Sequence, residues 1–298
     1  MSDSGSLFND DDLFGSSEPV VRETRQSEPE SAPYAARYSN SRIKPISLDG
    51  LNPMQREAAE HVNGPLLVVA GAGSGKTRVL THRIAHLISN HGVSPMNVLA
   101  ITFTNKAAGE MKHRVESLIG PVAKSMWVST FHSACVRILR VHAERIGYPK
   151  TFSIYDQADA QRLTGYVIRD MGLDVKRFTP RAVHAVISNW KNELVSPTQA
   201  AERAAHIFDR KHSEIYREYQ ERLLKAGAMD FDDLLVNVVR LFRMHTDVLA
   251  SYQDRFKYIL VDEYQDTNIA QNEIVLSLAA RHHNVCVVGD TDQSIYAF

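Results

Sequence analysis

A glycine-rich segment between an apolar run and a helical pattern has the composition of a phosphate-binding loop. Glycines let the backbone curl so that several N–H groups face one anion, and a helix N-terminus adds positive potential. Lys76 can neutralise phosphate charge, and the hydroxyl of Thr77 can bind magnesium. The strict motif begins with glycine where this chain has Ala70, which is also small. The residues expected to bind phosphates are Ala70, Gly71, Ala72, Gly73, Ser74, Gly75, Lys76 and Thr77.

Two carboxylates follow a second apolar run and suit the same chemistry. Asp262 and Glu263 come directly after residues 258–261. P-loop enzymes place a magnesium-binding Asp at such a strand end, and the next carboxylate can polarise the water that attacks the nucleotide. The alternatives are a chance glycine-rich turn and a solvated acidic strand end. Because both motifs occur in one chain, the sequence favours nucleotide hydrolysis with Mg²⁺.

Five short apolar runs predict the element that positions these residues. The runs are almost continuously apolar and have helical patterns between them, which is typical of a parallel sheet covered on both faces. Between about residues 131 and 256 the spacing is helical and no convincing strand occurs, so we expect an all-α insertion in an α/β domain. The expected strands are residues 66–70, 98–103, 127–129, 258–261 and 285–288.

The expected domain limits follow from this pattern. Residues 1–45 are rich in acidic residues, serine and proline, so we expect a disordered acidic tail. The few apolar residues in this tail could bind a partner, but such residues are more often incidental. Residues 46–130 and 257–298 should form the discontinuous α/β domain, and residues 131–256 the helical insertion.

Short polar side chains mark several helix starts. The pairs at 52–53, 179–180 and 196–197 each place Asn, Thr or Ser before proline, as an N-cap before the first helical turn requires. The acidic residues at 230, 232 and 233 could imitate a metal cluster. A helix start with Asp230 as N-cap and Asp233 at the third position explains them more simply.

Overall composition excludes several classes of protein. The 34 Lys and Arg residues balance 35 Asp and Glu residues, so any nucleic-acid surface must be local. Cys135 and Cys286 suggest no disulfide framework, and the histidines lack zinc-ligand spacing. No apolar run approaches the roughly 18 residues of a membrane span, so we expect no membrane contact and a cytoplasmic, nucleoid-associated location.

Seven strings, in order, resemble the successive motifs of the UvrD/PcrA/Rep group of superfamily 1 DNA helicases. The resemblance extends from about residue 48 to residue 298. It implies an α/β fold of the RecA-like P-loop NTPase type, interrupted by a helical insertion, and an ATP-dependent DNA helicase. The strings are LNPMQREAA, AGAGSGKT, ITFTNKAAGEMKHRV, VSTFHSACVRIL, DFDDLL, LVDEYQDTN and VVGDTDQSIYAF.

This resemblance also implies further residues around the nucleotide. Gln55 would read the adenine edge, Arg78 would pack on the base, and Gln293 would sense the γ-phosphate. Gln55 stands three residues after Asn52, so it could instead only complete a capping box. Arg78 could be an ordinary solvated residue. ATP and Mg²⁺ are the implied cofactors, and the implied catalytic residues are Lys76, Glu263 and Gln293.

Single-stranded DNA is the partner that the resemblance implies. Aromatic side chains stack on bases for about 1–3 kcal/mol each, without regard to sequence. Phe298 stands where the family usually has tryptophan, so stacking should be weaker there. Without the motifs, each aromatic would more often be core and a single His would more often be structural. The residues expected to contact DNA are Thr102, Phe103, Asn105, His132, Tyr296 and Phe298.

By the same resemblance the chain corresponds to the first half of a motor. The family's second RecA-like domain supplies arginines to the ATP site, so we expect a truncated chain that binds ATP better than it hydrolyses it. The intact parent should move 3′ to 5′ on single-stranded DNA and unwind duplex at single-strand/duplex junctions, with repair or replication proteins as possible partners. The alternatives are a nucleotide- and DNA-binding module without useful turnover and the motor of a helicase-nuclease. The oligomeric state stays open.

Overall fold

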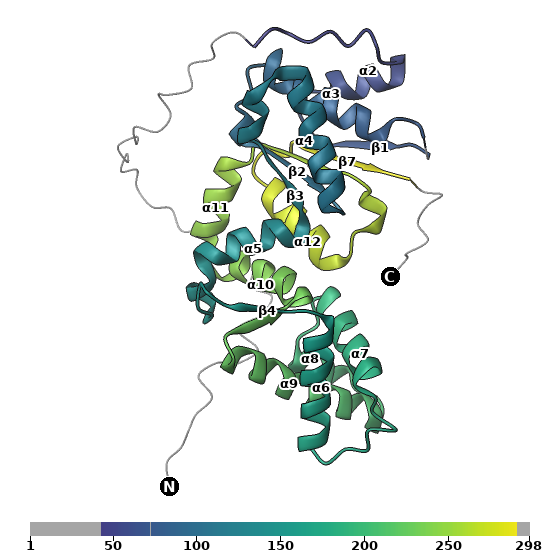
Figure 1. Cartoon of the computed structure of the whole chain (residues 1–298), viewed down its shortest axis with the longest axis vertical. Helices are drawn as coiled ribbons and strands as arrows, with labels where there is room; N and C mark the ends of the chain where they lie inside the picture. The colour runs from purple at the N-terminus through teal and green to yellow at the C-terminus, as the bar shows by residue number, and fades with distance from the viewer. Residues whose placement is uncertain (1–42, 72, 291–298) are drawn as a thin grey trace.

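The computed structural model describes residues 43–71 and 73–290, and a five-stranded parallel sheet lies in its upper part in Figure 1. Its strand order is β1-β7-β6-β2-β3. All five predicted strands are confirmed. Their bounds are β1 Leu66–Val69, β2 Val98–Thr102, β3 Trp127–Thr130, β6 Tyr258–Val261 and β7 Val285–Gly289.

Helices cover both faces of this sheet, which explains why its strands are apolar on both sides. The helices α3 (Lys76–Ser89) and α4 (Asn105–Ile119) share one core with alternate residues of the strands. On the other face, helices share a second core with Leu99, Ile101 and Ile259. These helices are α5 (Phe131–His142), α10 (Phe231–Met244), α11 (Thr246–Arg255) and α12 (Ile269–Ala279).

Four other helices have a core of their own, away from the sheet, in the lower part of Figure 1. Their buried residues include Val167, Val183, Ile187 and Tyr219. A further helix, α2 (Pro53–Glu60), packs against α3 beside the sheet. The four are α6 (Gln157–Asp170), α7 (Pro180–Asn192), α8 (Pro197–Arg203) and α9 (Ile207–Lys225).

The expectation of no strand between residues 131 and 256 was wrong in one detail. A two-stranded parallel sheet joins β4 (Ser153–Tyr155) to β5 (Ala228–Asp230). Each strand has three residues, which is too short for an alternation of apolar and polar residues to become visible. The fold class, an α/β protein with a parallel central sheet, is confirmed.

Each predicted N-cap is confirmed. The side chains of Asn52, Thr179, Ser196 and Asp230 accept hydrogen bonds from the backbone N–H three residues on. Four shorter 3₁₀ helices complete the described elements. They are η2 (Pro95–Asn97), η3 (Pro121–Ser125), η4 (Ala143–Ile146) and η5 (Tyr264–Asp266).

A buried ion cluster fastens α7 and α9 to the start of α10. Lys191, 1% exposed, lies 2.7 Å from both Asp230 and Asp233, and the Tyr219 hydroxyl donates to Asp230 over 2.8 Å. Gln220 donates to Asp233 over 3.0 Å. The predicted capping box is therefore present, and the same carboxylates also compensate a buried lysine.

The division into residues 46–130 plus 257–298 and residues 131–256 stays a prediction. Packing places α5, α10 and α11 in the core beneath the sheet, whereas α6 to α9 share the separate core. The predicted tail lies almost entirely outside the described residues. Within the described part of the chain, no helix has the length and apolarity that crossing a bilayer requires.

Candidate functional site

The glycine-rich loop leaves β1 and enters α3 as the sequence predicts. Ala70 donates from its backbone to the Gly289 carbonyl over 3.0 Å, which extends the pairing of β1 with β7. Gly73 (φ +74°) and Gly75 (φ +87°) adopt left-handed backbone, which other residues rarely tolerate. Gly71 accepts from Ser74 across the turn. The loop thus leads its backbone to the N-terminus of α3, where anions bind.

Lys76, the first residue of α3, lies between two carboxylates. Its ammonium is 3.3 Å from Asp290 Oδ2 and 3.7 Å from Glu263 Oε2, and the lysine is only 8% exposed. Sequence reasoning missed Asp290. Asp290 follows β7 as Asp262 follows β6. The carboxyl ends of neighbouring parallel strands meet at one edge of a sheet, so an acid at the end of a predicted strand was the signal that could have identified Asp290.

Thr77 and Asp262 meet at the same edge. The Thr77 hydroxyl donates to Asp262 Oδ2 over 3.4 Å, and the backbone N–H of Glu263 donates to Asp262 Oδ1 over 3.1 Å. Burial, and next the charge of Glu263, raise the pKa of Asp262 above its usual value. A buried carboxylate beside a hydroxyl is a donor set that suits Mg²⁺, because a cation would offset the burial of that charge.

Glu263 adopts an unusual backbone conformation beside Asp262. Its φ is +50°, a left-handed value that costs a non-glycine residue on the order of 1 kcal/mol. The side chain is 38% exposed, and its carboxylate accepts a hydrogen bond from Gln265 over 2.8 Å. The turn therefore directs this acid toward the loop and Lys76.

Gln55 joins α2 to the glycine-rich loop. It completes the capping box with Asn52, which was the alternative role predicted for it. It also donates a hydrogen bond to the Ser74 carbonyl over 2.8 Å. A side chain at Gly75 would displace Gln55 from the loop, since a Cβ there would lie 2.8 Å from Gln55 Nε2. A cavity of about 440 Å³ opens beside Gln55, between α2, β1 and the loop. Reading of adenine by Gln55 stays a prediction.

Arg78 holds the chain segment that precedes α2. Its guanidinium donates to the Gly50 carbonyl over 2.8 Å, and the residue is exposed. The arginine thus lies next to the loop, while its predicted packing on the base stays a prediction.

The residues predicted to contact DNA differ in accessibility. Thr102 is 1% exposed, and its hydroxyl donates to the Thr104 carbonyl over 3.1 Å, so the side chain supports the turn after β2 instead of facing solvent. Phe103 is half-buried, with its ring edge-on to Phe131 at 6.0 Å. Asn105, at the start of α4, is exposed. Of these three residues, Phe103 and Asn105 are the accessible ones.

His132 contacts an aromatic residue that sequence reasoning had assigned no function. The ring of Phe231, 49% exposed at the start of α10, stands edge-on to His132 at 5.8 Å. Burial lowers the pKa of His132, so the neutral ring is favoured. Phe231 lies in the DFDDLL string, and its place in that family motif was the signal that could have identified it as a functional residue. An exposed aromatic ring beside His132 extends the surface on which bases could stack.

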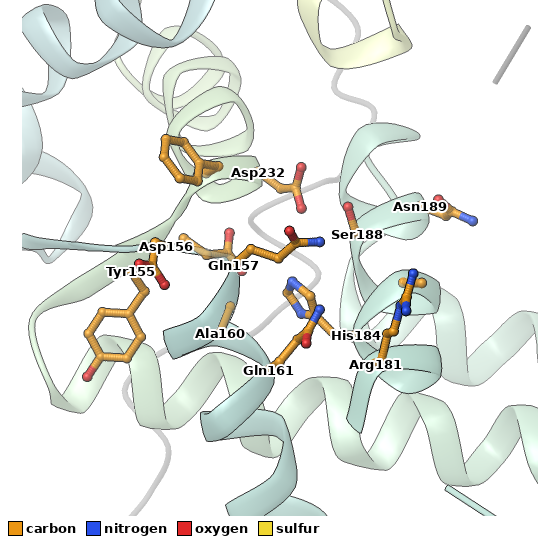
Figure 2. A pocket seen from close by; sticks show the side chains of 13 residues that line it. Tyr155, Asp156, Gln157, Ala160, Gln161, Arg181, His184, Ser188, Asn189 and Asp232 are labelled. Atoms are coloured by element: carbon orange, nitrogen blue, oxygen red, sulfur yellow. The ribbon is translucent and has the colours of Figure 1, made fainter. Parts of the chain in front are cut away.

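A second cavity, of about 570 Å³, lies in the helical part of the chain and includes Phe231 in its lining. Figure 2 shows Gln157 and Gln161 of α6 facing Ser188 and His184 of α7 across it. Most of the residues that line it have side chains that can donate or accept hydrogen bonds. Because Phe231 also touches His132, the cavity borders the predicted DNA surface.

Four predicted site residues lie outside the described residues, so their roles stay predictions. They are Ala72, Gln293, Tyr296 and Phe298.

Comparison with known proteins gives matches over most of the chain. Residues 51–298 match the family of the UvrD/REP helicase N-terminal domain. The chain is 54% identical to the ATP-dependent DNA helicase PcrA of Bacillus subtilis (strain 168) and 51% identical to the PcrA of Staphylococcus aureus (strain Mu50 / ATCC 700699). It is 53% identical to the ATP-dependent DNA helicase UvrD1 of Mycobacterium bovis (strain ATCC BAA-935 / AF2122/97).

Each of these alignments covers 84% of the chain and 34% of the relative, so the chain spans about a third of the relatives' length. The family match begins just before α2 and includes the glycine-rich loop, both carboxylate-bearing strand ends and the helices between them. Because more than four-fifths of the sequence matches one family at this identity, the chain belongs to the UvrD/REP helicase family and carries its N-terminal domain.

Proposed function

We propose that this chain is the ATP-binding part of a DNA helicase that couples ATP hydrolysis to movement along single-stranded DNA. One observation carries the proposal: Lys76, Thr77, Asp262 and Glu263 meet at the carboxyl edge of the sheet, although nearly two hundred residues separate the two pairs. Phe103 follows β2 at the same edge. When the nucleotide site and the DNA site lie at one edge of the sheet, a change at the first can move residues at the second.

The residues at this edge suit ATP and Mg²⁺. The loop from Gly71 to Lys76 would hold the phosphates, and Thr77 and Asp262 would hold the cation, Asp262 through water. When bound, Mg²⁺ would neutralise part of the negative charge that develops on the phosphates. Lys76 is held by Glu263 and Asp290, so it is already positioned beside the loop.

Glu263 is the residue that we assign to the attacking water. Its carboxylate is partly exposed and adjoins Lys76, so a water beside it would lie next to the phosphate-binding loop. A carboxylate in this position orients the water and accepts its proton as the water attacks the γ-phosphate. Its loss should therefore slow hydrolysis while nucleotide binding persists.

DNA would lie across the surface formed by Phe103, Asn105, His132 and Phe231. The exposed or half-buried rings offer stacking that is indifferent to base identity, which a motor that moves along any sequence needs. We extend the family resemblance to 3′ to 5′ movement, to unwinding at single-strand/duplex junctions, and to a cytoplasmic role in DNA repair or replication. These finer properties rest on the resemblance.

A second candidate is a nucleotide- and DNA-binding module with little turnover. The observation that favours it is the pairing of Lys76 with Glu263 and Asp290, since a lysine neutralised by two acids offers less charge to a transferring phosphate. Related P-loop enzymes gain about 10³- to 10⁵-fold in turnover from an additional arginine. Hydrolysis separates the two candidates.

The test is single-turnover ATP hydrolysis by the chain, with protein in excess and with or without single-stranded DNA. Lys76→Ala serves as the blank, and binding of a fluorescent ATP analogue is measured in parallel. We expect wild-type hydrolysis above the blank and a further rise with DNA. Glu263→Gln should bind the analogue like wild type and hydrolyse at the blank rate. Binding without hydrolysis by the wild-type chain would favour the second candidate, and an equal loss of nucleotide affinity in both variants would overturn these assignments.

A further inference from the structure

The side chain of Gln265 bridges the motif that contains Glu263 and the end of β7. Its Nε2 donates to Glu263 Oε2 over 2.8 Å, and its Oε1 accepts from the backbone N–H of Asp290 over 3.0 Å. The Asp290 N–H can only donate, so the amide oxygen must face it and the NH₂ group must face the carboxylate. Both ends of one amide are therefore used, and they fix its orientation.

Gly289 leaves the space that this bridge occupies. A Cβ at Gly289 would lie 2.9 Å from Gln265 Oε1, closer than real Cβ contacts allow. The Gly289 carbonyl accepts from Ala70 at the start of the phosphate loop. The Gly289–Asp290 peptide is therefore held on one side by the loop and on the other by Gln265.

The two carboxylate oxygens of Glu263 differ in their contacts. Within residues 43–71 and 73–290, the ion pair with Lys76 and the hydrogen bond from Gln265 both involve Oε2. Oε1 is thus the oxygen that can accept a proton from water. A carboxylate on a partly exposed turn has several rotamers, and two contacts on one oxygen select the rotamer that directs the other outward.

We infer that Gln265 is a positioning residue that fixes the Glu263 carboxylate for water activation by tying it to the Gly289–Asp290 peptide. The inference rests on the proposed function, because it assigns a support to the residue that would activate water. It also links Asp290, the first residue after β7, to that carboxylate through one side chain. Displacement of Asp290 would move the Gln265 amide and, with it, Glu263.

Three variants separate positioning from a structural role. Gln265→Ala removes both hydrogen bonds. Gln265→Glu keeps an oxygen for the Asp290 N–H but cannot donate to Glu263 when ionised. Gln253→Ala is the matched control, because Gln253 donates to the Ser277 carbonyl over 2.7 Å, between α11 and α12 and away from the phosphate loop.

Single-turnover hydrolysis and binding of the fluorescent ATP analogue are measured for each variant of the 298-residue chain. Both Gln265 variants should hydrolyse about 10- to 100-fold more slowly than wild type, because misplacement of a catalytic group by about 1 Å costs on the order of 10²-fold. Their nucleotide affinity should stay within about twofold of wild type, as expected for a residue that acts on the chemical step. Gln253→Ala should match wild type in both measurements.

Gly289→Ala tests the same bridge from the opposite side. The added methyl should displace the Gln265 amide and slow hydrolysis, and it should have no further effect in the Gln265→Ala background, where the clash is gone. Effects that multiply in the double variant would overturn the inference. So would a Gln265→Glu variant that hydrolyses like wild type, or parallel losses of rate and nucleotide affinity.

The outcomes distinguish this inference from the proposed function. If wild type hydrolyses no faster than Lys76→Ala, the proposed hydrolysis is overturned and the inference with it. If wild type exceeds that blank and Gln265→Ala equals wild type, only the inference is overturned.

Discussion

The Thr77 hydroxyl donates a hydrogen bond to the Asp262 carboxylate over 3.4 Å, and this bond joins two residues that are 185 positions apart. Thr77 is the second residue of α3, which follows β1, and Asp262 comes directly after β6. Strand β7 lies between β1 and β6 in the sheet, so the two residues meet across the end of a third strand. The helices α6 to α9 occur in the sequence between these residues and form their core elsewhere.

Removal of the Thr77 hydroxyl should weaken nucleotide binding only when magnesium is present. We expect Thr77→Ala to lose about tenfold in ATP affinity, on the order of one hydrogen bond, in Mg²⁺ but not in EDTA. Thr77→Ser keeps the hydroxyl and should remain close to wild type. Fluorescence titration with an ATP analogue measures this, and an equal loss in EDTA would show that the hydroxyl acts on the fold of the loop.

Shortening Gln55 should affect both the loop and the choice of base. Gln55→Ala removes the hydrogen bond to Ser74 and half of a capping box, so we expect a loss of about 1 kcal/mol in the free energy of unfolding. If Gln55 reads adenine, the preference for ATP over GTP should fall about tenfold as well. Competition binding with both nucleotides measures this.

The matched control for that prediction is Gln199→Ala. Gln199 completes the capping box of α8 with Ser196 in the same way. This substitution should cost similar stability and leave the nucleotide preference unchanged. An unchanged preference in Gln55→Ala would limit that residue to its structural role.

Replacement of Phe103 should weaken single-stranded DNA binding without loss of the fold. Phe103→Leu keeps apolar contact with the core but removes the aromatic face, so we expect about 5- to 100-fold weaker binding, the equivalent of one stacked base. Fluorescence anisotropy with several unrelated oligonucleotides measures it, and the loss should be similar for all. Phe208→Leu, an exposed ring of α9, is the control. Equal losses in both variants would show that Phe103 has no special role.

The buried ion cluster should give a pH-dependent difference in stability. Burial, and next the charge of Asp230, raise the pKa of Asp233 to about 6. Between the usual aspartate pKa and about 6, the folded chain holds a proton that the unfolded chain has released. The contribution of Asp233 to stability therefore falls as pH rises through this window.

Asp233→Asn imitates the protonated carboxyl, so its cost should decrease by about 1–3 kcal/mol between pH 4.5 and pH 7.5. Urea unfolding of wild type and variant at both pH values measures this difference in the free energy of unfolding. The histidines are common to both chains, so their contribution to the pH dependence cancels. A cost that is the same at both pH values would contradict the raised pKa.

Local patterns in the sequence were sufficient for much of this fold. The five strands follow from apolar runs, and the starts of α2, α7, α8 and α10 follow from side chains that cap their own helix within three residues. The glycine-rich loop and the acids after β6 were also visible, because each motif occupies consecutive residues. The sequence by itself thus determined the strands of the main sheet, these helix starts and the class of fold, and it predicted the chemistry of the two main motifs.

Only the tertiary structure decided which distant groups share an environment. The strand order brings Asp290 to Lys76, and close packing places the Gln265 amide against Gly289. The same holds for Lys191, whose partners are about forty residues away, and for Thr102, which is buried with the rest of β2 although the sequence predicted a DNA contact there. Such contacts depend on how strands and helices pack. No short window of sequence carries that information, because each partner's residue type fits many other environments equally well.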